Sequence, residues 1–156
     1  MKLSYSIPGK IWWITNFLDY HMYKGIHDAI IKERKKINLH SSKGIWSEHL
    51  KTLVRHNIHF QLNDIQKMST TIHFMEKNSG INWHDDHGWK YGATFYINHK
   101  WQKQWGGEFM FTDDNGHGWI PPVGNSLVII KSPLTHKVNP VLSPIVPRIT
   151  VQIFMK

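Results

Sequence analysis

Cysteine is absent from this sequence of 156 residues. Without a thiol, the chain can form neither a disulfide framework nor a cysteine-based nucleophile. Long apolar runs are also lacking: no segment approaches the roughly 20 apolar residues of a membrane helix, and the first residues have no apolar stretch of the secretory kind. Because a cysteine-free chain also fits a reducing compartment, we expect a soluble, cytoplasmic protein with no membrane partner.

Acidic residues are scarce, with 11 Asp and Glu against 19 Lys and Arg, so the formal net charge is +8. A basic balance favours polyanionic partners or acidic substrates. The only dense basic run lies at residues 32–36, however, where cations also complement the dipole of a helix end. Hydrophobic residues make up 40% of the chain and include eight Trp, which is enough for a packed core and argues against disorder.

The first third of the chain carries a helical pattern. Apolar residues recur at three- and four-residue steps over residues 17–36 and again over residues 46–56, which predicts two amphipathic helices. Asn16 and Ser47 are the expected N-caps, because the side chains of Asn and Ser accept a hydrogen bond from the first helical turn.

After residue 57 the pattern changes to short β-branched and aromatic runs, separated by Gly, Pro, Asn and Asp. Short strands at this spacing are typical of a sandwich or barrel. We predict one α+β domain over residues 1–156, with helical support in 1–57 packed on one sheet of a double-sheet β core in 58–156. The expected strands are residues 68–76, 92–98, 107–113, 126–131 and 148–154.

Residues 84–87 read His-Asp-Asp-His, which is either a solvated polar turn or half of a metal site. If the segment is extended, alternate side chains share a face, so His84 pairs with Asp86 and Asp85 with His87. Imidazole with carboxylate suits Fe(II), Mn(II), Co(II) or Zn(II). In a chain with 12 His and 11 acidic residues, about one His-x-acid pair is expected by chance, so this pair alone identifies no site.

Two later residues complete the pattern. His136 follows the apolar run 126–131 and begins another extended segment, so it is the candidate second histidine of a two-His, one-carboxylate triad. Arg148 lies on the apolar run 148–154, where a buried cation is costly unless it is paired. No acidic residue is near it in sequence, and a bound dicarboxylate would supply the partner. Thr150, two residues on, shares its strand face.

The sequence also predicts where the neighbours of His84 and Asp86 lie. Trp83 and Trp89 flank it and are candidates for the mouth of the site. Asp85 and His87 are expected beside the metal or at its entrance, without binding it. The remaining histidines show no regular spacing and are expected at the surface.

Taken in order, these motifs resemble the 2-oxoglutarate- and Fe(II)-dependent oxygenases, in particular the prolyl 4-hydroxylase-like branch. The resemblance implies a jelly-roll core, also called a double-stranded β-helix. It also implies that His84, Asp86 and His136 are the iron ligands, and that Arg148 binds 2-oxoglutarate. Thr150 and Tyr96 are implied as further 2-oxoglutarate contacts. The motifs are residues 84–86, 93–98, 106–111, 121–130, 136–138 and 148–150.

The resemblance further implies hydroxylation of an unactivated C–H bond in a prolyl or other residue of a peptide or protein, or in a free amino acid. Fe(II), 2-oxoglutarate and O2 are the expected cofactor and co-substrates, with ascorbate as a candidate reductant. Retention of Asp86 favours hydroxylation over halogenation. Residues 74–77, where many prolyl hydroxylases carry a Tyr, contain none. Several collagen-type relatives also have Lys where this chain has Arg148.

Two alternatives remain at the level of sequence. One is a non-catalytic metal-binding β-domain, which would have no need for 2-oxoglutarate. The other is an oxidative nucleic-acid demethylase, which the net charge of +8 would suit. That branch carries a second Arg shortly after the first on the same strand, whereas residues 148–154 contain only Arg148. A polypeptide or amino-acid substrate is therefore favoured over a nucleic acid.

Overall fold

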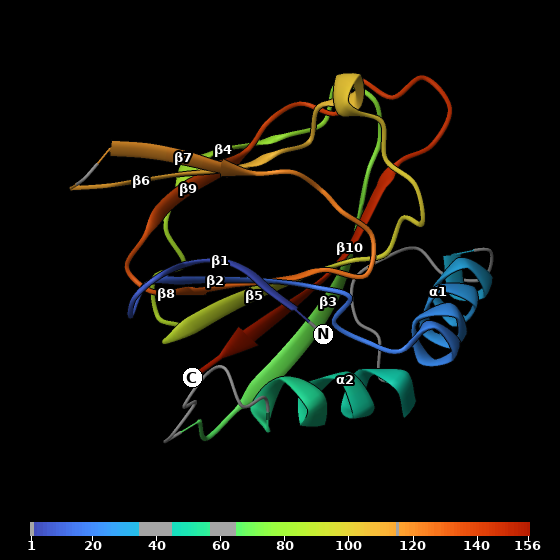
Figure 1. Ribbon diagram of the computed structural model, residues 1–156, viewed down its shortest axis with the longest axis horizontal. Coiled ribbons are helices and arrows are strands. Elements are labelled where there is room, and N and C mark those ends of the chain that lie inside the picture. The colour runs from blue at the N-terminus through green and yellow to red at the C-terminus, as the bar shows by residue number, and fades with distance from the viewer. Residues whose placement is uncertain (1, 35–44, 57–64, 115) are drawn as a thin grey trace.

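The computed structural model describes residues 2–34, 45–56, 65–114 and 116–156. Its elements are β1 (Lys2–Ile7), β2 (Ile11–Thr15), α1 (Tyr20–Arg34), α2 (Ile45–Arg55), β3 (Met68–Met75), β4 (Ile81–His84), β5 (Tyr91–Tyr96), η1 (Lys103–Trp105), β6 (Phe109–Asp113), β7 (Gly116–Ile120), β8 (Leu127–Lys131), β9 (Thr135–Val138) and β10 (Arg148–Met155). The strands form a larger sheet of order β1-β2-β8-β5-β10-β3 and a smaller sheet of order β4-β9-β6-β7 (Figure 1).

The larger sheet separates two environments, because successive side chains of a strand point to opposite faces. Alternate residues of β10 join an apolar cluster that also contains side chains of both helices: Ile149, Val151, Ile153 and Met155. The intervening residues Arg148, Thr150 and Gln152 face the smaller sheet. This alternation explains how a strand with an apolar sequence carries a buried arginine.

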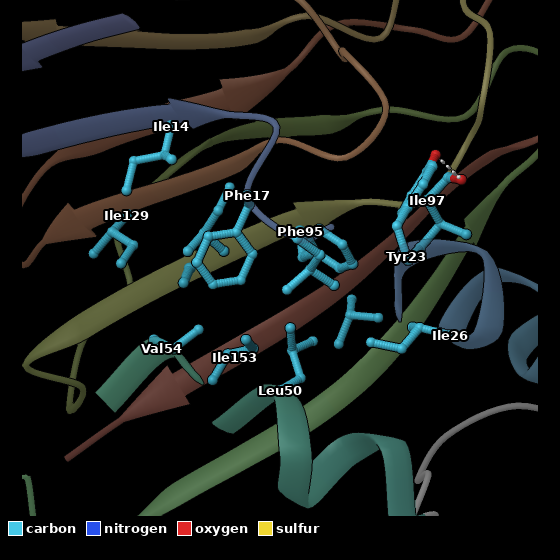
Figure 2. Close-up of a cluster of buried hydrophobic side chains, with 14 of the residues drawn as sticks. Ile14, Phe17, Tyr23, Ile26, Leu50, Val54, Phe95, Ile97, Ile129 and Ile153 are labelled. Carbon is cyan, nitrogen blue, oxygen red and sulfur yellow. Dashed lines mark hydrogen bonds between the residues drawn. The ribbon is translucent and has the colours of Figure 1, made fainter. Parts of the chain in front are cut away.

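Side chains of α1 and α2 enter the same buried cluster as those of the larger sheet (Figure 2). Leu50 and Val54, four residues apart on α2, are fully buried. Tyr23 of α1 is also buried, and its hydroxyl donates a hydrogen bond to the Ile97 carbonyl at 2.8 Å. Full burial of a Leu or Val side chain contributes about 1.5–3 kcal/mol. The opposite face of the larger sheet meets the smaller sheet (Figure 1).

All five predicted strands are present, as β3, β5, β6, β8 and β10. The front of the chain differs from the prediction, because residues 2–15 form two strands before the first helix. β2 pairs with β8, which buries Ile11 and Ile14 completely. The five residues of β2 show no clear alternation on their own, and only the neighbouring strand defines their buried face. β4 and β7 are also unpredicted, because β4 is short and β7 contains two glycines.

Neither predicted helix cap is correct. Asn16 adopts a left-handed φ of 49° and does not cap α1. Asp19 takes that role, and its Oδ1 accepts a hydrogen bond from the Met22 amide at 3.0 Å. Ser47 lies inside α2, where it is fully buried. Its hydroxyl is hydrogen-bonded to the Thr70 hydroxyl of β3 at 2.7 Å, so it links the helix to the larger sheet.

Candidate metal centre

His84, Asp86 and His136 come together at one end of the smaller sheet. His84 ends β4 and stands directly opposite His136 of β9 in the antiparallel register. Asp86 lies between them, with 3.9 Å from its Oδ1 to His84 Nε2 and 3.8 Å from its Oδ2 to His136 Nε2. One ligand atom from each of the three residues lies within 4.8 Å of the other two. Such a cluster of two imidazoles and a carboxylate is a metal-binding arrangement.

Backbone contacts orient both imidazole rings. His84 Nδ1 lies 2.8 Å from the Asn82 carbonyl oxygen, and His136 Nδ1 lies 2.7 Å from that of Leu134. A carbonyl only accepts, so each Nδ1 carries the hydrogen and each Nε2 presents a lone pair toward Asp86. Burial lowers the pKa of His136, which favours the neutral imidazole that metal ions bind.

The turn after β4 sorts the four polar residues into two pairs. The strand ends at His84, so continuous strand geometry through residue 87 is not formed. The pairing predicted from alternation is nevertheless observed, because His87 Nε2 lies 2.9 Å from Asp85 Oδ1. The Trp89 amide donates to the Asp86 carbonyl at 3.1 Å. This bond closes the turn and holds Asp86 beside the histidines.

Gly92 of β5 makes room for the carboxylate. A Cβ atom at this position would lie 2.6 Å from Asp86 Oδ2, which is closer than such atoms approach in proteins. The close packing of the Asp86 carboxylate on the β5 backbone therefore depends on the absence of a side chain at residue 92.

A cavity of ≈ 50 Å³ contains the three candidate ligands. His73, which the sequence pattern places at the surface, is wrongly assigned: it points from β3 into this cavity. It is directly opposite Thr150 in the register of β3 and β10, so it shares the inward face. Only the pairing of the two strands reveals this. The other lining residues are Ile81, Thr94, Phe109, Val138, Gln152 and Phe154.

Arg148 is buried on the same face of the larger sheet, at 1% exposure. Its Nη1 lies 3.4 Å from Met75 Sδ. Within the described residues, its Nε and Nη2 have no hydrogen-bond partner, and neither has the buried hydroxyl of Tyr96. The guanidinium lies 5.0 Å from the centre of the Tyr96 ring. Burial lowers the pKa of Arg148 and raises that of Tyr96, because both charged forms lose solvation.

Glu76 and Glu108, the candidate acidic partners of Arg148, are hydrogen-bonded to other residues. Glu76 accepts from Arg34 Nη2 at 2.6 Å, and Glu108 accepts from Asn139 Nδ2 at 3.2 Å. Among the described residues, no carboxylate forms an ion pair with Arg148. A buried cation with two unpartnered donor nitrogens fits an anionic ligand that supplies a carboxylate.

Neither of the two tryptophans beside the triad is among the residues that line the cavity. Trp89 packs against the lining residue Phe154, with ring centroids 5.5 Å apart. Trp83 is 46% exposed and lies under Lys137 Nζ at 5.1 Å. Both Trp83 and Lys137 are sequence neighbours of a candidate ligand, so alternation turns them to the outer face of the smaller sheet.

Comparison with known proteins gives the family. The sequence profile of the 2OG-Fe(II) oxygenase superfamily matches residues 70–156, more than half of the chain. The chain therefore belongs to the 2OG-Fe(II) oxygenase superfamily, whose members use Fe(II), 2-oxoglutarate and O2. It is a 2-oxoglutarate-dependent dioxygenase. The pairing of a metal-binding triad with an unpaired buried arginine fits this chemistry. No curated protein sequence is significantly similar to the chain.

Solved structures of prolyl hydroxylases share the fold at low sequence identity. A prolyl-4-hydroxylase of Pseudomonas putida matches with a TM-score of 0.72 and 16% identity, over 94% of this chain and 87% of that one. A Trichoplax adhaerens prolyl hydroxylase, in complex with a hypoxia inducible factor peptide, matches at 0.79 and 14%, over 95% and 84%. The viral collagen prolyl hydroxylase of Paramecium Bursaria Chlorella virus-1 matches at 0.66 and 13%, over 97% and 95%.

In the described ranges, no helix has the length and apolar content needed to cross a bilayer.

Proposed function

We propose that this dioxygenase hydroxylates a prolyl or other amino-acid residue of a peptide or protein, or a free amino acid. The oxidised bond is an unactivated C–H. The similarity of the fold to prolyl hydroxylases supports this substrate class, and the solved complex with a peptide is an example within that fold. The observation that carries the use of 2-oxoglutarate is the buried guanidinium of Arg148, with two nitrogens that lack hydrogen-bond partners, on the sheet that faces the triad.

In this proposal, His84, Asp86 and His136 hold Fe(II), which supplies the oxidising chemistry when it is bound with 2-oxoglutarate and O2. The two Nε2 atoms and the Asp86 carboxylate are the donor atoms. Retention of the carboxylate ligand favours hydroxylation over halogenation. Ascorbate is a candidate reductant that keeps the iron in its ferrous state.

The residues of the larger sheet hold the co-substrate in this proposal. Arg148 donates to a carboxylate of 2-oxoglutarate through its fork of N–H groups, and Tyr96 and Thr150 add hydroxyl groups beside it. Thr150 faces Tyr96 directly in the register of β5 and β10. Tyr96, Arg148 and Thr150 are almost fully buried, so water is kept from these charge-assisted contacts, which strengthens them.

We propose that residues 1–156 form one domain. Its two sheets make the jelly-roll core, with α1 and α2 supporting the larger sheet from outside. The cluster shared by the helices and the larger sheet supports this arrangement, as do the fold matches over more than 90% of the chain. The absence of cysteine is in keeping with the proposed cytoplasmic location.

A direct assay tests the function. Conversion of 2-oxoglutarate to succinate should occur with Fe(II) and rise with a proline-rich peptide or a free amino acid. Methylated single-stranded DNA should give no stimulation, and stimulation by DNA alone would replace the proposal with the demethylase alternative. Metal binding without any 2-oxoglutarate turnover would favour the non-catalytic domain. The Asp86→Ala variant serves as the inactive control.

A further inference from the structure

Three polar side chains form a continuous hydrogen-bonded row on the inner face of the larger sheet. The Thr94 hydroxyl of β5 donates to Gln152 Oε1 of β10 at 2.8 Å. Gln152 Nε2 in turn donates to the Thr150 hydroxyl oxygen at 3.3 Å. Thr94 is 8% exposed and Thr150 is fully buried. Burial of polar groups is costly unless they are hydrogen-bonded, so each bond offsets part of the cost of placing this row inside.

The row connects the metal cavity to the buried arginine. Thr94 and Gln152 line the cavity that contains the triad. Thr150 lies two residues along β10 toward Arg148, which is about 6.6 Å at the usual rise of a strand. Thr150 and Arg148 share the inward face because they are also two residues apart.

The direction of the two bonds determines where the Thr150 hydrogen points. Because Gln152 Oε1 accepts from Thr94, its Nε2 is turned toward Thr150, and an amide nitrogen can only donate. The Thr150 oxygen therefore acts as an acceptor toward Gln152, and its own hydrogen is available for a different acceptor. The guanidinium of Arg148 has no acceptor to offer.

We propose that Thr94 and Gln152 form a positioning relay that presents the Thr150 hydroxyl hydrogen, beside Arg148, to a carboxylate of 2-oxoglutarate. This inference rests on the proposed co-substrate site. It gives Thr94 and Gln152, which do not belong to that site, the role of positioning the Thr150 hydroxyl. Gln152 acts through Thr150, and Thr94 acts through Gln152. Thr150 alone contacts the co-substrate through this row.

A competing explanation is that Gln152 contacts 2-oxoglutarate directly. The two explanations differ in how mutations combine. If Gln152 acts only through Thr150, its removal has no further effect once the Thr150 hydroxyl is gone. If Gln152 makes its own contact, the two losses add. A double-mutant cycle measures this difference.

The experiment is calorimetric titration of 2-oxoglutarate into the Ni(II)-loaded, oxygen-free protein, which measures binding without turnover. The variants are Thr150→Val, Gln152→Leu, Thr94→Val and both double variants that contain Thr150→Val. Thr150→Val should weaken 2-oxoglutarate binding about tenfold, the loss typical of one hydrogen bond to a charged group. Gln152→Leu and Thr94→Val should each weaken it several-fold, and neither should add to the effect of Thr150→Val.

Controls separate positioning from general damage. Thr150→Ser keeps the hydroxyl and should retain wild-type binding. Gln66→Leu, at an exposed position before β3, should change nothing. Ni(II) affinity should be unchanged in every variant, because none of these residues belongs to the triad.

Two outcomes would overturn different parts of the argument. If the wild-type protein binds Ni(II) but no 2-oxoglutarate, the proposed function itself fails. If the wild type binds 2-oxoglutarate and the effects of Gln152→Leu and Thr150→Val are additive, or Thr94→Val has no effect, the relay is wrong while the function stands.

Discussion

Two imidazole rings, those of His84 and His136, lie with centroids 4.2 Å apart at the end of β4 and β9. With Asp86 they supply the three protein donors of the proposed iron site. We expect His84→Ala, Asp86→Ala and His136→Ala each to weaken metal binding strongly. Mutation of a residue that only hydrogen-bonds to a metal ligand typically costs about 10- to 100-fold in affinity, and loss of a ligand itself should cost more. Metal titration by calorimetry is the measurement.

Neighbouring residues provide the matched controls for this prediction. Asp85→Asn and His87→Gln alter the second pair of the turn, whose members are not among the three candidate ligands. Both variants should keep metal affinity close to that of the wild type. Wild-type affinity in His136→Ala, or loss of metal in Asp85→Asn alone, would show that the donors are wrongly assigned.

The burial of Arg148 predicts a large effect of its mutation on 2-oxoglutarate binding. Arg148→Ala should raise the Michaelis constant for 2-oxoglutarate by roughly 30- to several-thousand-fold, because loss of a buried charge-assisted pair costs on the order of 2–5 kcal/mol. Arg148→Lys keeps the charge but loses the bidentate guanidinium, so its Michaelis constant for 2-oxoglutarate should lie between those of the wild type and Arg148→Ala. Metal affinity should hardly change. A folded Arg148→Ala protein with unaltered 2-oxoglutarate dependence would rule out the anchoring role.

Gly92 tests the packing of the triad without touching a ligand. In Gly92→Ala, the new methyl group would meet Asp86 Oδ2 at 2.6 Å, so the carboxylate must move and metal affinity should fall at least several-fold. Gly25→Ala is the control, because a Cβ there meets nothing within 4 Å on helix α1. That variant should gain roughly 0.5–1 kcal/mol of stability and bind metal normally. Equal metal affinity in both variants would contradict the packing argument.

The sequence predicts the residues of the site unequally. His84, Asp86 and His136 are predictable because a two-residue spacing and a following apolar strand carry the signal locally. Arg148 is predictable because a cation within an apolar strand demands a partner. His73 is not, since its place in the cavity follows only from the pairing of β3 with β10, far away in sequence. Gln152 shares the strand face of Arg148 and Thr150 by alternation, but its place beside the triad follows only from the packing of the strands.

At the scale of elements, the junction of α1 with the end of β5 depends on one buried phenol. Burial raises the pKa of Tyr23 to about 12, from about 10 in an exposed side chain. Because the fold favours the protonated form, this contribution to stability is complete below pH 10 and is lost as the pH rises from 10 to 12. The loss is at most about 2–3 kcal/mol at 1.36 kcal/mol per pKa unit.

The Tyr23→Phe variant isolates this effect. It should be less stable at neutral pH by about 0.5–1.5 kcal/mol, the net value of a typical hydrogen bond, because the Ile97 carbonyl loses its donor. Its stability should fall less steeply between pH 10 and 12 in chemical denaturation. Tyr20→Phe, at a position 63% exposed, should keep the wild-type slope. The same slope in Tyr23→Phe and wild type would contradict the assignment.

Elements with their own periodicity are predictable from this sequence, and elements defined by their neighbours are not. β10 and β5 consist of β-branched and aromatic residues over six or more positions. β2 becomes a strand because β8 offers a free edge, and β7 because β6 holds its two glycines in register. The cap predicted at Asn16 is wrong for a similar reason. The two amides that follow it, those of Phe17 and Leu18, donate hydrogen bonds to the carbonyl and side chain of Asn125, a residue far away in sequence.

For the whole molecule, the fold tolerates wide sequence change. The prolyl hydroxylases of similar structure share only 13% to 16% of residues with this chain, yet match over more than 90% of it. Two packed sheets with alternating faces impose a pattern of residue character at most positions, and many sequences satisfy it. The few positions that need one residue type, such as the triad, carry the chemistry.

The triad and the buried arginine belong to different sheets, and this division has a mechanical consequence. The histidine donors are on the smaller sheet, whereas Arg148, Thr150 and Tyr96 are on the larger one. A dicarboxylate bound at one end to the metal and at the other to Arg148 would link the two sheets. The sheets could then separate only after the dicarboxylate dissociates. In hydrogen exchange, Ni(II) alone should slow the amides of β4 and β9, and added 2-oxoglutarate should extend the slowing to β10. Protection confined to β4 and β9 would mean that 2-oxoglutarate does not link the smaller sheet to the larger one.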